Sequence, residues 1–232
     1  MTLKTANVMV VTPHPDDAEY GVAGSVALWV KNGRSVIYVV CTNGNKGTSD
    51  RKIKPEELVK TREREQRNAA RILGVKEVIF LNYPDQYLED TPQFRKQLVR
   101  LIRKFKPETV VTVDPYLRYF WWHRDHRVCG QVVMDAIFPY GRDHLAYPDL
   151  LEQELEPHKV RELLLFNTSS PNYRIDISET FDKKVEALRC HRSQVANFAA
   201  ELEFRLRDWA LRMAQEEEFE LAEEFHRVDI WW

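Results

Sequence analysis

Short apolar runs and longer amphipathic stretches alternate along the first half of the chain. Each run is continuous and rich in β-branched residues, which is typical of a strand buried on both faces of a parallel sheet. Each longer stretch repeats its apolar residues with the period of an α-helix. The expected strands are residues 7–12, 35–41, 77–81 and 109–113, and the expected helices are residues 16–32, 55–73, 91–105 and 125–138.

This alternation predicts the fold class. Strand–helix–strand units of this length are right-handed crossovers between parallel strands. We therefore expect an α/β, Rossmann-like fold in which a mostly parallel sheet lies between two layers of helices. Residues 161–166 and 175–177 are expected to add a fifth and a sixth strand. Ligands of such folds bind beyond the carboxyl ends of the strands, at the turns that lead into helices.

The pattern changes after Ser178, beyond which we expect helices alone, over residues 179–195 and 200–225. The apolar stripe of the second helix is Leu202, Leu206, Trp209 and Met213. It turns acidic at residues 216–217, so this helix cannot stay packed along its whole length. No linker divides the chain. We expect residues 1–195 to form the domain proper and residues 196–232 a helical C-terminal extension of it.

Composition and charge exclude several classes of function. The 232 residues are 44% hydrophobic, enough for a sizeable core, and 34 Lys and Arg against 36 Asp and Glu leave a net charge of −2. This balance argues against a nucleic-acid partner, and no apolar run is long enough to span a membrane. Cys41, Cys129 and Cys190 lack a paired spacing, which is typical of reduced thiols. With no signal-peptide pattern at the start, we expect a cytoplasmic protein with a small-molecule partner.

The first chemically unusual segment, HPDD at residues 14–17, directly follows the first strand. One explanation is helix capping, because Pro at the start of a helix and Asp in its first turn suit the helix geometry and dipole. Capping does not explain His14. The other explanation is a binding or catalytic site at the carboxyl end of the sheet.

The second such segment, HRDH at residues 123–126, follows the fourth strand at the same edge of the sheet. With residues 14–17 it gives six polar groups able to converge. A catalytic divalent metal such as zinc takes three His or carboxylate ligands and leaves a position for water. This pool can supply three ligands and still leave an Asp and a His for proton transfer.

Two other motif interpretations fail. His-Arg-Asp occurs in the catalytic loop of protein kinases, but Gly130 stands where that loop requires Asn, and the other kinase motifs are missing from the sequence. The turn after the first strand has no G-x-G-x-x-G dinucleotide signature, since Gly21 and Gly24 fall inside the following helix. Neither motif therefore accounts for these residues.

The helix expected over residues 55–73 carries two charges, Arg62 and Glu65, on its apolar stripe. One interpretation is a salt bridge between them at the rim of the core, because buried charges are usually paired. The other is that Arg62 points into the cleft and holds a substrate hydroxyl or an oxyanion. The spacing alone leaves both open.

Five motifs, in this order, resemble the LmbE-like or PIG-L-type family of zinc-dependent N-acetylglucosamine deacetylases over most of residues 5–195. They are HPDD, the R-x-x-E helix that ends in AARILGV, NYPD after the third strand, the H-x-D-H segment, and IDISETFDKKVEAL followed by RCHRSQ. By this resemblance the metal ligands are His14, Asp17 and His126, and the cofactor is Zn²⁺ or another divalent metal.

The resemblance also implies roles in catalysis and substrate binding. Asp16 would be the general base, and His123, oriented by Asp125, the acid or oxyanion partner. Arg62 would contact the sugar or its aglycone, and His191 would lie near the acetyl group. For His191, a capped or partly buried imidazole on a C-terminal helix is equally open.

The activity implied is removal of the N-acetyl group from an N-acetylglucosamine derivative, giving acetate and a free amino sugar. An amidase acting on a larger acyl or thiol conjugate is an alternative, because it would use the same metal site with a wider cleft. A sugar- or nucleotide-binding module without turnover is another. Such a module has no need of Asp16 and His123 together, which favours an enzyme.

Several features depart from the family pattern or remain outside it. Arg124 stands where the family often has Pro, and the role of Asp85-Gln86 after the third strand is left open. The aromatic segment at residues 116–122 either stacks on a sugar or packs into the core. The C-terminal aromatic residues are expected to dock on the same chain or on another subunit, which favours a homo-oligomer. They are Phe219, Phe225, Trp231 and Trp232.

Overall fold

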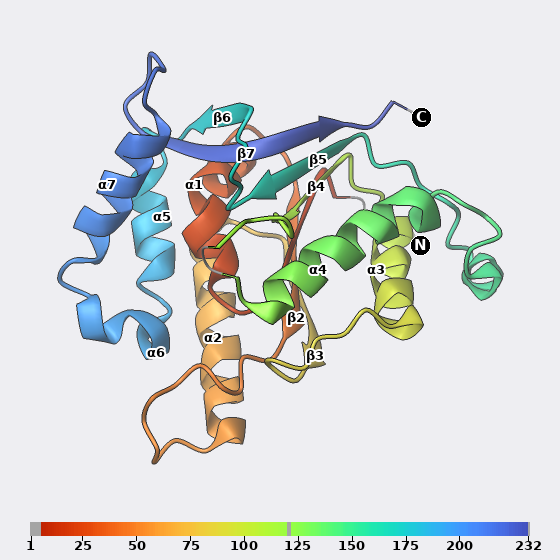
Figure 1. The fold of residues 1–232 in the computed structure, drawn as a ribbon, viewed down its shortest axis with the longest axis horizontal. Helices are drawn as coiled ribbons and strands as arrows, with labels where there is room; N and C mark the ends of the chain where they lie inside the picture. The colour runs from red at the N-terminus through yellow and green to blue at the C-terminus, as the bar shows by residue number, and fades with distance from the viewer. Residues whose placement is uncertain (1–5, 120–121, 232) are drawn as a thin grey trace.

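The computed structural model describes residues 6–119 and 122–231 and is built on one sheet with helices on both faces (Figure 1). Its strands are β1 (Val8–Thr12), β2 (Val36–Thr42), β3 (Glu77–Tyr83), β4 (Thr109–Val113), β5 (Glu162–Phe166), β6 (Tyr173–Asp176) and β7 (Ala222–Asp229). They lie in the order β3-β2-β1-β4-β5-β7-β6. The expected α/β, Rossmann-like fold with a mostly parallel sheet is confirmed.

The parallel part of the sheet explains the continuous apolar runs. β1 pairs in parallel with β2 and β4, β2 pairs with β3, and β4 pairs with β5. Every residue of β1, β2 and β4 is buried, because helices cover both faces. The chain winds from β1 to β2 on one side and returns to β4 on the other. The carboxyl ends of β1 and β4 are therefore a topological switch point, where folds of this kind bind ligands.

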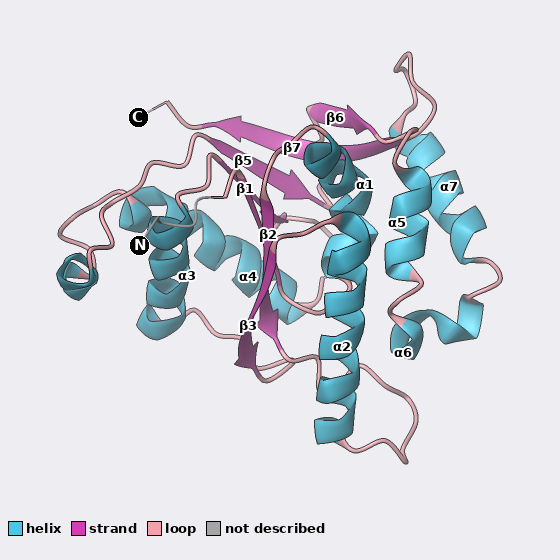
Figure 2. Ribbon diagram, turned by 180° about the vertical axis from the view of Figure 1, so that it is seen from behind, coloured by secondary structure: helices cyan, strands magenta, loops and turns pink. Residues whose placement is uncertain are grey.

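The helices form two layers (Figure 2). One layer contains α1 (Asp17–Lys31), α2 (Pro55–Leu73) and α5 (Phe181–Leu188), and the other contains α3 (Pro92–Phe105) and α4 (Arg124–Asp135). The remaining helical segments are η1 (Ala136–Gly141), η2 (Pro148–Gln153), α6 (Arg192–Val195), η3 (Ala196–Phe198) and α7 (Leu202–Met213). Within the described residues, no helix combines the length and the apolar character needed to cross a membrane.

Two predicted helices are interrupted. The helix expected to run to Phe138 ends as α4 at Asp135 and continues as a π-helix in which Phe138 has extended backbone angles. Pro139 explains this change, because the residue before a proline avoids the helical conformation. The helix expected over residues 179–195 is split into α5 and α6, with His191 in the turn between them.

The prediction that only helices follow Ser178 is wrong, because residues 222–229 form β7. This strand is antiparallel to β5 on one side and to β6 on the other, so it covers an edge of β5 that would otherwise be unpaired. Its alternation was hidden by Glu223, a charged residue that is buried. Glu223 accepts the backbone N–H groups of Gly24 at 3.0 Å and Ser25 at 2.7 Å, and Lys184 Nζ lies 2.5 Å from its carboxylate.

The C-terminal aromatic residues divide between the core and the surface. Phe225 is fully buried against its own chain and Phe219 is half-buried, whereas the side chain of Trp231 is 84% exposed. Trp232 lies outside the described residues. The expectation that this cluster docks on the same chain is therefore met by Phe225 and not by Trp231.

The three cysteines are free thiols, as the sequence predicts. Cys41 at the end of β2 and Cys129 in α4 are buried, and their sulfur atoms lie 3.7 Å apart. Cys190 is partly exposed. Burial raises the pKa of the Cys41 thiol well above its ordinary value, and the neighbouring Cys129 raises it further. Cys41 is therefore held as a neutral, unreactive thiol.

Replacing Glu223 by Ala should lower the free energy of unfolding by about 3–5 kcal/mol, because Lys184 would stay buried without its counter-charge. The double variant Lys184→Met/Glu223→Leu should lose less than the sum of the two single losses. Urea denaturation measures all three, with Glu220→Ala on the exposed turn as a control expected to change stability by less than about 0.5 kcal/mol. If the stability loss of the double variant equalled the sum of the two single losses, Lys184 and Glu223 would not interact as a buried ion pair.

Candidate active site

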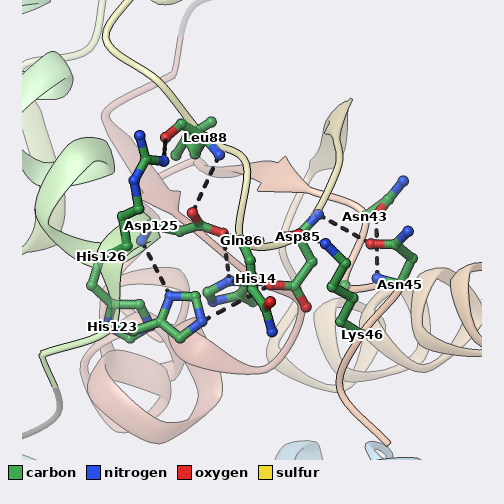
Figure 3. A network of polar contacts seen from close by, with 12 residues as sticks. His14, Asn43, Asn45, Lys46, Asp85, Gln86, Leu88, His123, Asp125 and His126 are labelled. Carbon is green, nitrogen blue, oxygen red and sulfur yellow. Dashed lines mark hydrogen bonds and ion pairs between the residues drawn. The ribbon is translucent and has the colours of Figure 1, made fainter.

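Polar side chains from three segments converge at the carboxyl ends of β1 and β4 (Figure 3). HPDD follows β1, the loop at residues 84–88 follows β3, and the H-x-D-H segment begins α4. The two clusters that the sequence placed at one edge of the sheet therefore meet in space. Figure 3 shows His14, Asp85, His123 and Asp125 turned toward one another.

His14 is the centre of this cluster. Its Nδ1 is 3.2 Å from Asp17 Oδ2, and its Nε2 is 3.1 Å from Asp85 Oδ1 and 3.2 Å from Asp125 Oδ2. Burial alone would lower the pKa of His14, but the contacts with Asp125, Asp17 and Asp85 raise it well above its ordinary value. One ring thus bridges three carboxylates from three different segments of the chain.

Asp17 links His14 to the second histidine of the cluster. Its Oδ1 is 3.3 Å from His126 Nε2, and its Oδ2 accepts the backbone N–H of His14 at 2.8 Å. Burial would raise the pKa of Asp17, but His126 and His14 lower it well below its ordinary value. The three residues expected to bind metal are therefore contiguous, and their carboxylate is ionised.

Among the described residues, two overlapping sets have possible ligand atoms that all lie within 4.8 Å of one another inside the set, close enough to hold one ion, and neither set includes Asp17. One set is His14, His123 and His126, and the other is His14, Asp85, His123 and Asp125. Asp85, to which the sequence assigned no role, is buried beside His14. Burial would raise its pKa, but His14 lowers it. Its position in NYPD after β3 was the available signal, because β3 ends at the same edge of the sheet as β1.

Asp16 has an unusual backbone conformation. It precedes the first residue of α1 with φ 99°, and its side chain makes no capping hydrogen bond. A non-glycine residue with positive φ costs about 1–3 kcal/mol, which the surrounding contacts must offset. Burial raises the pKa of Asp16 to about 6, and the Arg62 guanidinium opposes that rise. The Asp16 carboxylate therefore caps no N–H group and faces Arg62, whereas Asp17 is in the first turn of α1, as the capping explanation expects of an Asp.

Arg62 lies beneath Asp16 and is only 3% exposed. It donates to the carbonyl oxygens of Pro15 at 2.7 Å and Gly44 at 3.1 Å, and its Nη2 is 3.3 Å from Asp16 Oδ2. A Cβ atom on Gly47 would stand 2.3 Å from Nη1, so the loop after β2 needs glycine to approach this closely. Arg62 thus ties the loops after β1 and β2 together.

The salt bridge between Arg62 and Glu65 that the sequence allowed is not the one formed. Glu65 instead accepts the backbone N–H of Ser193 at 2.9 Å and its hydroxyl at 2.6 Å. Gln194, the next residue, donates to the carbonyl of Gly47 at 3.0 Å. The motif RCHRSQ therefore anchors the C-terminal helices to α2 and to the loop after β2.

A buried network of polar side chains, which the sequence did not predict, holds the backbone of Asp16. Gln66 accepts the backbone N–H of Asp16 at 2.9 Å and donates to both carboxylate oxygens of Glu19 at 2.9 and 3.0 Å. His191 Nε2 lies 3.1 Å from the same carboxylate. Gln66, Glu19 and His191 are all fully buried. His191 therefore occupies the buried position that the sequence left open as one of two alternatives.

Asp125 and His123 contact each other differently from the prediction. The Asp125 carboxylate accepts the backbone N–H groups of Gln86 at 2.6 Å and Leu88 at 3.2 Å, in addition to contacting His14. Among the described contacts, His123 meets Asp125 only through the backbone, where the Asp125 N–H donates to His123 Nδ1 at 3.1 Å. The carboxylate thus orients His14 and the loop after β3, while the peptide group orients His123.

His123 lies at the outer side of the cluster. Its ring meets that of His14 edge to face, with centroids 4.6 Å apart. Burial lowers its pKa, and the neighbouring His14 and His126 lower it further. The ring is therefore held neutral, and because Nδ1 accepts a hydrogen bond, the proton sits on Nε2.

The aromatic segment after β4 is on the surface rather than in the core. Tyr116, Tyr119 and Trp122 are 60%, 85% and 64% exposed, and Trp122 borders the opening above Asp17, His123 and His126. Residues 120–121 lie outside the described residues. Core packing is thus the wrong explanation for the three described aromatic residues of this segment. Arg124 turns away from the opening, since its guanidinium contacts the carbonyl of Leu88 and lies 3.6 Å from Glu89.

Comparison with known proteins gives consistent relatives. Residues 9–137 match the family model PIG-L, described as GlcNAc-PI de-N-acetylase. A diacetylchitobiose deacetylase of Thermococcus kodakarensis is 36% identical over 187 residues, which cover 81% of this chain and 69% of that protein. A probable N-acetyl-alpha-D-glucosaminyl L-malate deacetylase 2 of Bacillus anthracis is 28% identical over 213 residues, 87% of each chain.

Solved structures with a similar fold also include a deacetylase. The inhibitor complex of N,N'-diacetylchitobiose deacetylase from Pyrococcus horikoshii superposes with a TM-score of 0.91 at 32% identity. The match covers 97% of this chain and 84% of that one. It therefore extends well beyond residues 9–137 and includes the C-terminal helices and β7.

Replacing Gln66 by Leu should lower the free energy of unfolding by about 2–4 kcal/mol, because Glu19 loses a donor and the Asp16 N–H loses its acceptor inside the protein. Urea denaturation measures the loss. Arg67→Leu, whose side chain pairs with Glu63 on the exposed face of the same helix, is the matched control and should change stability little. Equal stability of the two variants would show that the buried network does not support the site.

Proposed function

Because the chain belongs to the PIG-L family, we propose that it is a metal-dependent hydrolase that removes the N-acetyl group from an N-acetylglucosamine derivative. The observation that carries the proposal is the cluster around His14, with Asp16 buried next to it. The products would be acetate and a free amino sugar. The relatives that support this activity act on an acetylated disaccharide and, by its name, on a malate conjugate.

We propose His14, Asp17 and His126 as the ligands of a divalent cation, with zinc as the metal. Two imidazoles and a carboxylate are a donor set that catalytic zinc uses, and they leave one position open. Both imidazoles adjoin the Asp17 carboxylate, through different oxygen atoms: His14 Nδ1 lies 3.2 Å from Oδ2, and His126 Nε2 lies 3.3 Å from Oδ1. When bound, the cation would polarise the acetyl carbonyl and make water acidic enough to react at neutral pH.

Asp16 is proposed as the general base. A pKa of about 6 leaves its carboxylate ionised at neutral pH and still basic enough to take a proton from water. The water oxygen then bonds to the acetyl carbon, and the bond from that carbon to nitrogen breaks. Asp16 returns the proton to the departing amine. His123, which lines the opening and is neutral with its proton on Nε2, would donate a hydrogen bond to the oxyanion.

Arg62 and His191 are proposed to act through other residues rather than on the sugar. Both side chains are buried, and the Arg62 guanidinium already donates hydrogen bonds to Pro15, Gly44 and Asp16. Arg62 would hold the strained Asp16 in place and keep its pKa from rising further. His191 would do the same through Glu19. This revises the substrate contacts that the family resemblance implies for these two positions.

We also propose that the protein works as a homo-oligomer in the cytoplasm. The exposed side chains of Trp231 and of Phe204 on α7 support contacts between subunits, since large apolar side chains on a surface favour association. Buried thiols of Cys41 and Cys129 that stay free at 3.7 Å support a reducing compartment.

Asp16→Asn should lose about 10²–10⁴-fold in kcat, because the amide cannot accept the proton from water. The metal content of the purified protein should stay the same. Acetate release from N-acetylglucosamine, diacetylchitobiose and a glucosaminyl malate conjugate measures the activity, with Asp50→Asn on the exposed loop as the matched control. Full turnover by Asp16→Asn would reject the mechanism.

His126→Ala and Asp17→Ala should each lose bound metal and activity together. Elemental analysis measures the metal, and a chelator should abolish wild-type acetate release until Zn²⁺ is added back. Wild-type activity that survives complete metal removal would reject the metal proposal. Absence of acetate from every substrate, with metal bound, would reject the deacetylase proposal.

A further inference from the structure

Two hollows meet at the proposed metal ligands. One is a cavity of about 160 Å³ between α1, α7 and β7, and Asp17 and His126 line its inner end. The other is a more open hollow of about 410 Å³, bordered by Trp122 and again lined by Asp17 and His126. A substrate held at these ligands therefore has access to both hollows.

An amide bound at the ligands has two substituents, and each needs a space of its own. The nitrogen carries the sugar, and the carbonyl carbon carries the acyl chain. The sugar is the larger group, and its hydroxyls are costly to remove from water, so the open hollow beside the exposed Trp122 suits it. The smaller and more enclosed cavity is then the space for the acyl chain.

The cavity is much larger than the methyl group of an acetyl. On this measure of volume one water-sized group needs about 10–15 Å³, and a methyl group is of similar size. An acetyl group would therefore fill only a small part of the 160 Å³. A chain of about four to six carbons would fill more of the cavity and still be enclosed by it.

The walls that an acyl chain would touch include a continuous apolar surface. Trp209 and Met213 lie one helical turn apart on α7 and supply one wall. Leu117 from the loop after β4 and the ring of Tyr20 on α1 add to it. Burial of one methylene group against such a surface gains about fourfold in an equilibrium constant. A longer chain should therefore bind better here than acetyl.

Two polar side chains of the cavity wall already have partners within the protein. The hydroxyl of Thr168 accepts the backbone N–H of Ser170 at 3.2 Å. The carboxylate of Glu224 lies 3.9 Å from Arg174 Nε, and burial raises its pKa while Arg174 opposes that rise. An apolar chain can lie beside both side chains without removing these partners.

We propose that this cavity is the acyl subsite, and that the protein hydrolyses glucosamine derivatives with N-acyl chains of about four to six carbons as well as the N-acetyl form. The water oxygen bonds to the acyl carbon, the bond from that carbon to nitrogen breaks, and the amine leaves with the proton. Butyrate or hexanoate then replaces acetate as the product. The inference rests on the proposed hydrolase function and widens its substrate class to short aliphatic acyl groups.

Release of the free amino sugar from N-acetyl-, N-propionyl-, N-butyryl- and N-hexanoylglucosamine tests the chain length. The value of kcat/KM for the butyryl substrate should exceed that for the acetyl substrate about tenfold, because two more methylene groups are buried. If acetyl were the best of the four, the acyl subsite would be overturned and the deacetylase function would stand.

Met213→Trp places a larger side chain in the cavity. It should lower kcat/KM for the butyryl substrate about tenfold and leave the acetyl value within about twofold of wild type. Both substrates are measured on one protein, so a folding defect cannot produce this difference. Met213→Leu nearly conserves volume and should keep the wild-type preference. Leu211→Trp, at a 44% exposed position of the same helix, is the matched control. Equal losses for both substrates would reject the placement of the chain against α7.

Binding to the metal-loaded Asp16→Asn variant tests the cavity without turnover. Calorimetry should show that N-butyrylglucosamine binds about tenfold more tightly than N-acetylglucosamine, and Met213→Trp in the same background should remove the difference. A butyryl preference in binding, without amine release from any substrate by the wild-type protein, would reject the hydrolase function and support the acyl subsite. Equal binding of the two sugars, with amine release by the wild-type protein, would reject the subsite alone.

Discussion

The contact of one imidazole ring with three buried carboxylates is the interaction on which the site depends. Asp17 and Asp125 lie in the first turns of α1 and α4, Asp85 lies in the loop after β3, and each approaches His14 within 3.2 Å. Even with His14 protonated, this group carries an excess of negative charge in a space that water hardly reaches. Such an arrangement is costly unless a cation completes it. Burial raises the pKa of the neighbouring Asp16 to about 6; Arg62 opposes that rise, and the charge of Asp17 adds to it.

The scaffold brings these carboxylates together through topology and then fixes them through backbone hydrogen bonds. Asp125 holds the loop after β3 by two peptide N–H groups, and Arg62 holds the loops after β1 and β2 by two carbonyls. The strained backbone of Asp16 is held by Gln66. A small change in any of these supports would move an atom of the cluster, so the geometry of the site depends on residues that lie around it.

The sequence predicted the parallel half of the sheet closely because its strands are buried on both faces and its helices have a regular period. The sequence did not predict β7, because Glu223 is buried in an ion pair with Lys184, whereas hydrophobic periodicity assigns every charged residue to the surface. The same limitation hid Glu19 and Gln66. In the sequence they look like ordinary polar residues of a helix, and only the structure shows that they contact His191 and Asp16. Contacts set by long-range pairing of polar groups cannot be derived from periodicity. The two histidine-containing motifs were found because three histidines at one sheet edge have no structural explanation.

The position of β7 also constrains how the molecule assembles. Glu223 bonds to α1 across 199 positions of sequence, and the strand separates β5 from β6 only after both have been made. Contacts of such long range are slow to form, because the loop between the partners must close first. Glu223 accepts the N–H groups of Gly24 and Ser25 in α1, the helix that begins at Asp17. The helix that carries Asp17 is therefore held in place by a strand from the far end of the sequence.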